Sequence, residues 1–196
     1  MNDPLTVGSD GQTPVHPDDL DGLLLDWIST QGELNDAESD NLDAGLRWAY
    51  GRRPSMSTLL DDRFLFELHR QCFGEVWAWA GQPRRRATSI GVDAIEVTRA
   101  TRDALLDAAA QLEHDAAGER RTTVLASLHH RLAAVHPFAN GNGRTLRLHA
   151  VLLARALGLP DPTWGAGRDK ARRQYLSALR QADGGDPATL ERFMWS

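Results

Sequence analysis

The residues best suited to chemistry lie in one run, residues 136–147, which reads HPFANGNGRTLR. His136 supplies an imidazole that can take a proton near neutral pH. Gly141 and Gly143 allow a ligand to approach the backbone closely, and Arg144 and Arg147 share one helix face because they lie three residues apart. Guanidinium groups beside free helix N–H groups bind linked phosphates. The run therefore predicts a phosphoryl or nucleotidyl transfer site.

Helices on both sides must position this run. Apolar residues recur at helical spacing before it, and Pro137 ends that helix because it disfavours helical geometry at His136. A second apolar stripe continues from Leu146 to Leu157. The second helix therefore begins at the loop, and its free N–H groups and positive dipole end face the imidazole. Phe138 is predicted to anchor the loop in the core.

The remainder of the chain is predicted to be mainly helical. One segment, 84–97, has β-branched residues around a Gly-Val-Asp turn and predicts a short β-hairpin. The predicted fold class is all-α, with this hairpin as a flap over the active site. We expect a flexible arm over 1–18, a helical segment over 19–58 and the main domain over 59–196. Helices are predicted over 35–50, 58–73, 99–113, 123–135, 146–157, 170–182 and 188–195.

Composition narrows the class of protein. A net charge of −5 argues against direct nucleic-acid binding through bulk electrostatics. No apolar run is long enough to cross a bilayer, and the first residues lack the features of a signal peptide, so we expect a cytoplasmic protein. The single cysteine, Cys72, excludes an intramolecular disulfide and a cysteine-based zinc site. Cys72 and His69 are predicted to have structural roles.

Each part of the run also has a structural interpretation. A Gly-Asn-Gly turn, a pair of arginines or a single histidine is most often structural, and only their order between two helices favours a functional site. His129 and His130 raise the alternative of a metal site. No carboxylate or cysteine pair lies nearby at ligand spacing, so hydrolysis by a metal alone ranks well behind nucleotidyl transfer.

Residues 136–147 resemble the signature of the Fic/DOC family, which is His-Pro-Phe, a variable residue, an acid, and Gly-Asn-Gly-Arg-x-x-Arg. The Trp79-Ala80-Gly81 step before segment 84–97 and the chain ending from Tyr175 to Phe193 resemble the family too. The resemblance covers roughly 59–193 and implies a Fic-like helical domain. Residues 32–35 and the Ala139-Asn140 pair further resemble the bacterial subgroup called mobile mystery protein B.

The resemblance implies a protein adenylyltransferase, which moves AMP from ATP to a Ser, Thr or Tyr hydroxyl of a target protein. A toxin-like enzyme of a mobile element, with an antitoxin-like partner or a second copy of itself, would fit this activity. His136 would be the general base. The phosphates would be held by the anion hole of Gly141, Asn142 and Gly143 and by Arg144 and Arg147.

The flap would dock the target protein. Segment 84–97 lies where the family carries its target-docking hairpin, and a free strand edge would align a target segment by strand addition. The residues of the flap that would do so are Thr88, Ser89, Ile90, Gly91 and Val92.

The sequence departs from the family at Asn140, where an acid usually holds Mg²⁺. Mg²⁺ takes only one or two protein carboxylates, so an amide oxygen predicts a weaker metal site and slower turnover. The Asn140-Gly141 pair is also prone to deamidation. This departure favours one rival, a catalytically weak Fic-fold binding protein. Transfer of a different nucleotide is a separate alternative within the enzyme class.

A further resemblance concerns regulation. Many Fic proteins carry a Ser/Thr-x-x-x-Glu-Gly/Asn segment whose glutamate pairs with the second arginine of the signature. Ser29 to Leu34 matches this segment except at Leu34. One hypothesis is that Glu33 pairs with Arg147 and inhibits the enzyme. The other is that Ser29 or Thr30 caps a helix with Glu33 in its first turn.

Overall fold

The computed structural model describes residues 16–166 and 170–196, and within these ranges every element is a helix apart from one isolated bridge between Leu23 and Trp77. The all-α prediction is confirmed. The predicted arm over 1–18 lies outside the described residues as far as residue 15. The elements are α1 Pro17–Leu20, α2 Gln31–Arg52, α3 Met56–Leu59, α4 Asp62–Phe73, the 3-10 turn η1 Ala94–Glu96, α5 Val97–Glu113, α6 Arg121–Val135, α7 Asn142–Ala156, α8 Ala171–Ala182 and α9 Ala188–Met194.

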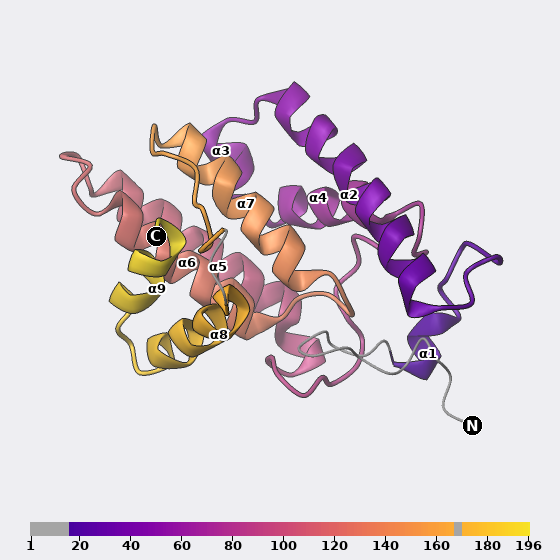
Figure 1. The fold of residues 1–196 in the computed structure, drawn as a ribbon. Helices are drawn as coiled ribbons and strands as arrows, with labels where there is room; N and C mark the ends of the chain where they lie inside the picture. The colour runs from indigo at the N-terminus through magenta and orange to yellow at the C-terminus, as the bar shows by residue number, and fades with distance from the viewer. Residues whose placement is uncertain (1–15, 167–169) are drawn as a thin grey trace.

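Helix α7 crosses the middle of the molecule, with α2 and α4 on one side and α6 on the other (Figure 1). It contributes a stripe of buried side chains, including Leu146 and Leu153, to the main core. Helix α9 packs against α6, and α8 packs against α9. The two ends of the site are therefore held by α2 and by the α8–α9 pair, with α7 between them.

The helix predicted over 58–73 is two helices. Ser55 caps α3, and its side chain accepts the N–H of Thr58. Asp61 then accepts the N–H of Arg63 at 2.8 Å and starts α4. Asp61 is a second N-cap within the apolar stripe. Its side chain accepts one of the free N–H groups at the start of a new helix, so the stripe is divided between two helices.

The predicted β-hairpin is wrong. Residues 84–93 form no strand and lead through η1 into α5. Their backbone bonds instead to the motif loop, since the Arg84 N–H donates to the Pro137 carbonyl at 2.9 Å and the Val92 N–H to the Val135 carbonyl at 3.4 Å. The buried Arg84 guanidinium donates to the carbonyls of Arg86 and Val92. A side chain thus joins the two limbs where a backbone ladder was expected.

Among the described helices, none combines the length and the apolar character that crossing a membrane requires.

Two buried histidines that face away from solvent couple stability to pH. Burial lowers the pKa of His129 to about 3 and that of His149 to about 4. His149 donates from Nε2 to the Leu59 carbonyl at 2.7 Å, which ties α7 to α3. In the unfolded chain both side chains would titrate near the ordinary value of about 6.5. Between these pKa values the unfolded chain binds more protons than the folded one, so acid favours unfolding.

We therefore predict that the free energy of unfolding is full above pH 6.5 and decreases as the pH falls toward 4. The contribution of His149 alone would be about 3 kcal/mol at pH 4. Denaturant titrations at several pH values measure this slope. His149→Gln should make it shallower, whereas His114→Gln, which changes an exposed histidine, should leave it unchanged. Equal slopes in both variants would contradict the prediction.

Candidate active site

His136 lies at the C-terminal end of α6, in the left-handed conformation with φ 54°, and is 7% exposed. Its N–H still donates to the Leu132 carbonyl at 3.1 Å. Burial, and next the positive charge of Arg84, lower the pKa of the imidazole to about 4, while a backbone hydrogen bond at Ala133 acts in the opposite direction. The imidazole is therefore neutral at pH 7, which is the form that accepts a proton.

Arg84 holds the backbone of this strained position. Its side chain is 4% exposed, and it donates from Nε to the His136 carbonyl at 2.7 Å and from Nη2 to the Val135 carbonyl at 3.2 Å. A left-handed conformation at a residue other than glycine persists only where the surroundings determine it. Sequence patterns do not predict this role, because they do not distinguish Arg84 from the adjacent Arg85 and Arg86.

His69 holds the motif loop through a hydrogen bond to Asn140 and a stacking contact with Phe138. Its Nδ1 accepts the Gly81 N–H at 2.9 Å, so Nε2 carries the proton and donates to the Asn140 carbonyl at 3.0 Å. The ring stacks on Phe138, with 3.8 Å between the centroids, and both side chains are fully buried. The predicted structural role of His69 and the predicted anchor role of Phe138 are confirmed.

The N-terminus of α7 forms the floor of the site. Gly141 is its N-cap at φ 76°, and a Cβ there would lie 2.8 Å from the Phe73 ring, so only glycine fits. The Asn142 side chain braces the loop by bonding both the N–H and the carbonyl of Phe138, at 2.9 and 2.8 Å. The anion site is thus left to the free backbone N–H groups of the first turn.

A cavity of about 620 Å³ brings the predicted motif residues together. This volume is typical of ligand sites in proteins. A larger cavity, of about 850 Å³, lies among α3, α4 and α5 and contains none of them, so size does not identify the site. The motif residues in the wall of the smaller cavity are His136, Asn140, Gly141, Asn142, Gly143, Arg144 and Arg147.

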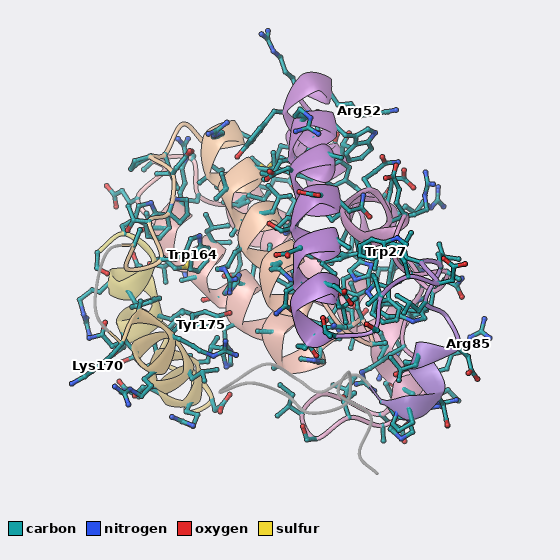
Figure 2. All side chains as sticks on the ribbon, turned by 45° about the vertical axis from the view of Figure 1, so that its right-hand side comes forward. Trp27, Arg52, Arg85, Trp164, Lys170 and Tyr175 are labelled. Carbon is teal, nitrogen blue, oxygen red and sulfur yellow. The ribbon has the colours of Figure 1, made fainter. Side chains whose placement is uncertain are left out.

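The two motif arginines differ in their surroundings. Arg144 pairs with Glu38 on α2 at 2.7 Å. Arg147 has no carboxylate at ion-pair distance within the described ranges, and it lies 5.9 Å above the centre of the Tyr175 ring. Burial lowers the pKa of Arg147. Tyr175 on α8 and Trp164 form an aromatic wall of the cavity, at the left of Figure 2.

Residues 59–154 match the Fic/DOC family. Solved structures with the same fold include the N-terminal Fic domain of the effector Bep8 from Bartonella sp. 1-1C, with a TM-score of 0.68, 14% identity, and coverage of 87% of this chain and 88% of that one. BepC from Bartonella tribocorum, solved with bound AMPPNP, gives 0.66, 15%, 91% and 96%. A variant of Fic-1 from C. elegans gives 0.61 and 26%, with coverage of 88% here and half of that chain.

Glu38 lines the same cavity as the motif residues, and the sequence analysis did not predict it as a site residue. It is 2% exposed, and its Oε1 accepts from Trp77 Nε1 at 2.8 Å and from Asn140 Nδ2 at 3.4 Å. A signal was available, because Glu38 falls on the buried face of α2 at helical spacing from its neighbours. That face consists of Leu34, Glu38, Asn41, Gly45 and Ala49.

Glu33 takes the capping position in this structure. The Thr30 side chain accepts the Glu33 N–H, and the Glu33 carboxylate accepts the N–H groups of Ser29 and Thr30 at 2.8 and 2.9 Å. These bonds, those of Ser29 first, lower the pKa of Glu33. Within the described ranges Glu33 does not pair with Arg147, because this capping box already engages its carboxylate. The inhibitory role stays a hypothesis.

The histidines that suggested a metal alternative have other partners. His129 Nε2 lies 2.8 Å from the Tyr175 hydroxyl, and His130 Nε2 lies 2.8 Å from Asp183 Oδ1. In the described part of the chain, no group of three or more His, Cys, Asp or Glu side chains could hold a metal ion.

The flap residues divide between two hollows. Ile90, 57% exposed, lines the cavity that contains His136. Thr88 and Ser89 line a groove of about 480 Å³ with Ala139. Gly91 and Val92 lie against the motif loop, since a Cβ at Gly91 would be 2.6 Å from Arg84 Nη2. Their role in target docking stays a prediction.

We predict that Arg84→Met raises the pKa of His136 by about one unit, because a nearby positive charge is removed. Loss of the Arg84 bonds to the His136 and Val135 carbonyls would also admit water to the imidazole, which would reduce the effect of burial on its pKa. Histidine-selective NMR titration measures this pKa directly. Arg85→Met is the matched control, because Arg85 is the exposed neighbour and donates to the Gln82 side chain. An unchanged His136 pKa in Arg84→Met would contradict the assignment.

Proposed function

We propose that the protein transfers AMP from ATP to a hydroxyl side chain of a target protein. The observation that carries this proposal is the shared cavity, in which a neutral buried imidazole, a helix N-terminus and Arg147 meet. Among the described residues no carboxylate forms an ion pair with Arg147. An anion cradle, a charge clamp and a base are the parts that nucleotidyl transfer requires. The match of residues 59–154 to the Fic/DOC family supports it.

The cavity has two chemically different ends, which suit the two ends of ATP. The first N–H groups of α7 and the Arg147 guanidinium favour the phosphates. The aromatic wall of Trp164 and Tyr175 offers apolar and ring surfaces for the base. The nucleotide-bound neighbours support this choice, since BepC was solved with AMPPNP and a Fic domain from Bartonella quintana with ADP.

The reaction follows from this placement. The target hydroxyl oxygen attacks the α-phosphorus of ATP while His136 takes the hydroxyl proton. The bond between the α-phosphorus and the oxygen bridging to the β-phosphate breaks, and pyrophosphate leaves with the bonding electrons. Arg147 and the α7 amides stabilise the charge that develops on the phosphates. Target docking along residues 88–92 would bring the hydroxyl beside His136, although not by addition to a strand.

The donor set of the cavity fits Mg²⁺. The Glu38 carboxylate and the Asn140 amide lie together, and phosphate and water oxygens would complete the shell, as is usual for this ion. When bound, Mg²⁺ neutralises charge on the nucleotide phosphates. The residues that would hold it are therefore Glu38 on α2 and Asn140 in the motif loop.

Two observations favour the rival, a catalytically weak Fic-fold binding protein. Arg144 is held by Glu38, and Asn140 replaces the acid of the family signature. A protein with its first motif arginine occupied could bind partners through residues 88–92 without turnover. The same measurement separates the two functions.

The decisive assay uses ATP labelled at either the α- or the γ-phosphate, a cell lysate as the source of targets, and Mg²⁺. We predict that label from the α-position appears on protein and that label from the γ-position does not. His136→Ala should lower the rate by about 10²–10⁴-fold, the typical contribution of a general base.

Controls make this assay specific. His130→Ala alters a histidine on α6 that does not line the cavity, and it should retain the rate of the unmodified protein. Transfer of the γ-label would identify a kinase in place of an AMP transferase. No transfer of either label under any condition would favour the binding protein.

A further inference from the structure

The Glu38 carboxylate is buried in the wall of the cavity that is proposed to bind the nucleotide phosphates. Glu38 comes from α2, is 2% exposed and lines the same cavity as the α7 N-terminus and Arg147. A buried negative charge beside bound phosphates is unfavourable unless a cation lies between them. The charge of Glu38 therefore requires an explanation beyond the phosphate site.

Arg144 supplies the balancing charge when no nucleotide is bound. Its Nη2 lies 2.7 Å from Glu38 Oε2, and the guanidinium also lies over the Phe73 ring at 4.7 Å. Arg144 lines the same cavity, so phosphates bound at the α7 N-terminus would attract its guanidinium away from Glu38. The Glu38 carboxylate would then keep only the neutral donors Trp77 and Asn140. Leaving a buried charge without its partner is strongly unfavourable, so a second cation must replace Arg144.

Because Asn140 is an amide, Glu38 has no second carboxylate beside it. Its Nδ2 donates to Glu38 Oε1 at 3.4 Å, and its Oδ1 accepts the Gly141 N–H at 2.7 Å. An aspartate at position 140 would set two carboxylates against each other at this distance and would lose the bond to Glu38. The amide thus matches a site whose one negative charge comes from α2.

We infer that Glu38 is the carboxylate ligand of the divalent cation that accompanies the bound nucleotide, with Asn140 positioning it. This inference rests on the proposed function only in requiring a nucleotide in the cavity. The site takes Mg²⁺ or Mn²⁺, with Glu38 as the charged protein ligand and phosphate and water oxygens in the other positions. Nucleotide binding exchanges the Arg144 guanidinium for the metal ion.

The test has two measurements. Electron paramagnetic resonance measures the affinity of the protein–ADP complex for Mn²⁺, and calorimetry measures the affinity of the protein for ADP without metal. Glu38→Gln should weaken Mn²⁺ binding by about tenfold or more, since loss of even an outer partner of a metal has an effect of this size. The same variant should bind metal-free ADP more tightly, because a negative charge leaves the cavity and Arg144 is released. An ion pair of purely structural value would predict only the second change.

Two further variants keep the test sharp. Asp40→Asn removes the same charge from an exposed position on α2 and should change neither affinity. The double variant Glu38→Gln with Asn140→Asp moves the carboxylate across to the loop and should restore Mn²⁺ binding. Intact mass measurement confirms that Asn140 has not deamidated in the other samples.

Unchanged Mn²⁺ affinity in Glu38→Gln would overturn the inference, as would an equal loss in Asp40→Asn. Its failure is distinguishable from that of the proposed function. Transfer of the α-label with Mn²⁺ affinity independent of Glu38 would remove only the role of Glu38. Glu38-dependent Mn²⁺ binding without any transfer of label would remove only the enzyme.

Discussion

The break between α6 and α7 is the constraint on which the site depends. His136 ends α6 in a left-handed conformation, and Gly141 starts α7 in another, so the loop between them must leave several carbonyls without helical partners. Arg84 and His69 satisfy these carbonyls from two other parts of the chain, and Asn142 braces the loop from within. The same bonds place a desolvated imidazole opposite a helix N-terminus.

Charge is distributed unevenly over the cavity that this break creates. Arg147 has no acidic partner in the described ranges, whereas Arg144 and Glu38 neutralise each other across the wall formed by α2. Burial disfavours the charged form of His136, and the Arg84 guanidinium adds to this effect. The resting site therefore carries an excess positive charge at Arg147 and the α7 amides, beside a neutral base. This arrangement attracts phosphates and leaves the proton acceptor free.

Local patterns in the sequence predicted the helices and the motif, because helical spacing, caps and proline stops act within a few residues. The hairpin was mispredicted because β-branched residues favour strands only where a partner strand exists, and here the buried Arg84 side chain replaced it. Glu38 was missed for a related reason. Glu38 is 102 residues from Asn140 and 106 residues from Arg144, so local sequence patterns do not predict these contacts. Only the position of Glu38 on the buried face of α2 indicates a role. Resemblance supplied the roles of the motif residues, and geometry supplied their partners.

In the proposed binding mode, the phosphates of ATP lie between the α7 N-terminus and Arg147, and the α-phosphorus faces His136. A crystal structure of the protein with a non-hydrolysable ATP analogue and Mg²⁺ tests it most directly. This binding mode predicts phosphate oxygens bonded to the backbone N–H groups of Asn142 and Gly143, in the first turn of α7, and the base against Tyr175. An analogue bound in the larger cavity among α3, α4 and α5, or with its phosphates turned away from His136, would contradict the account.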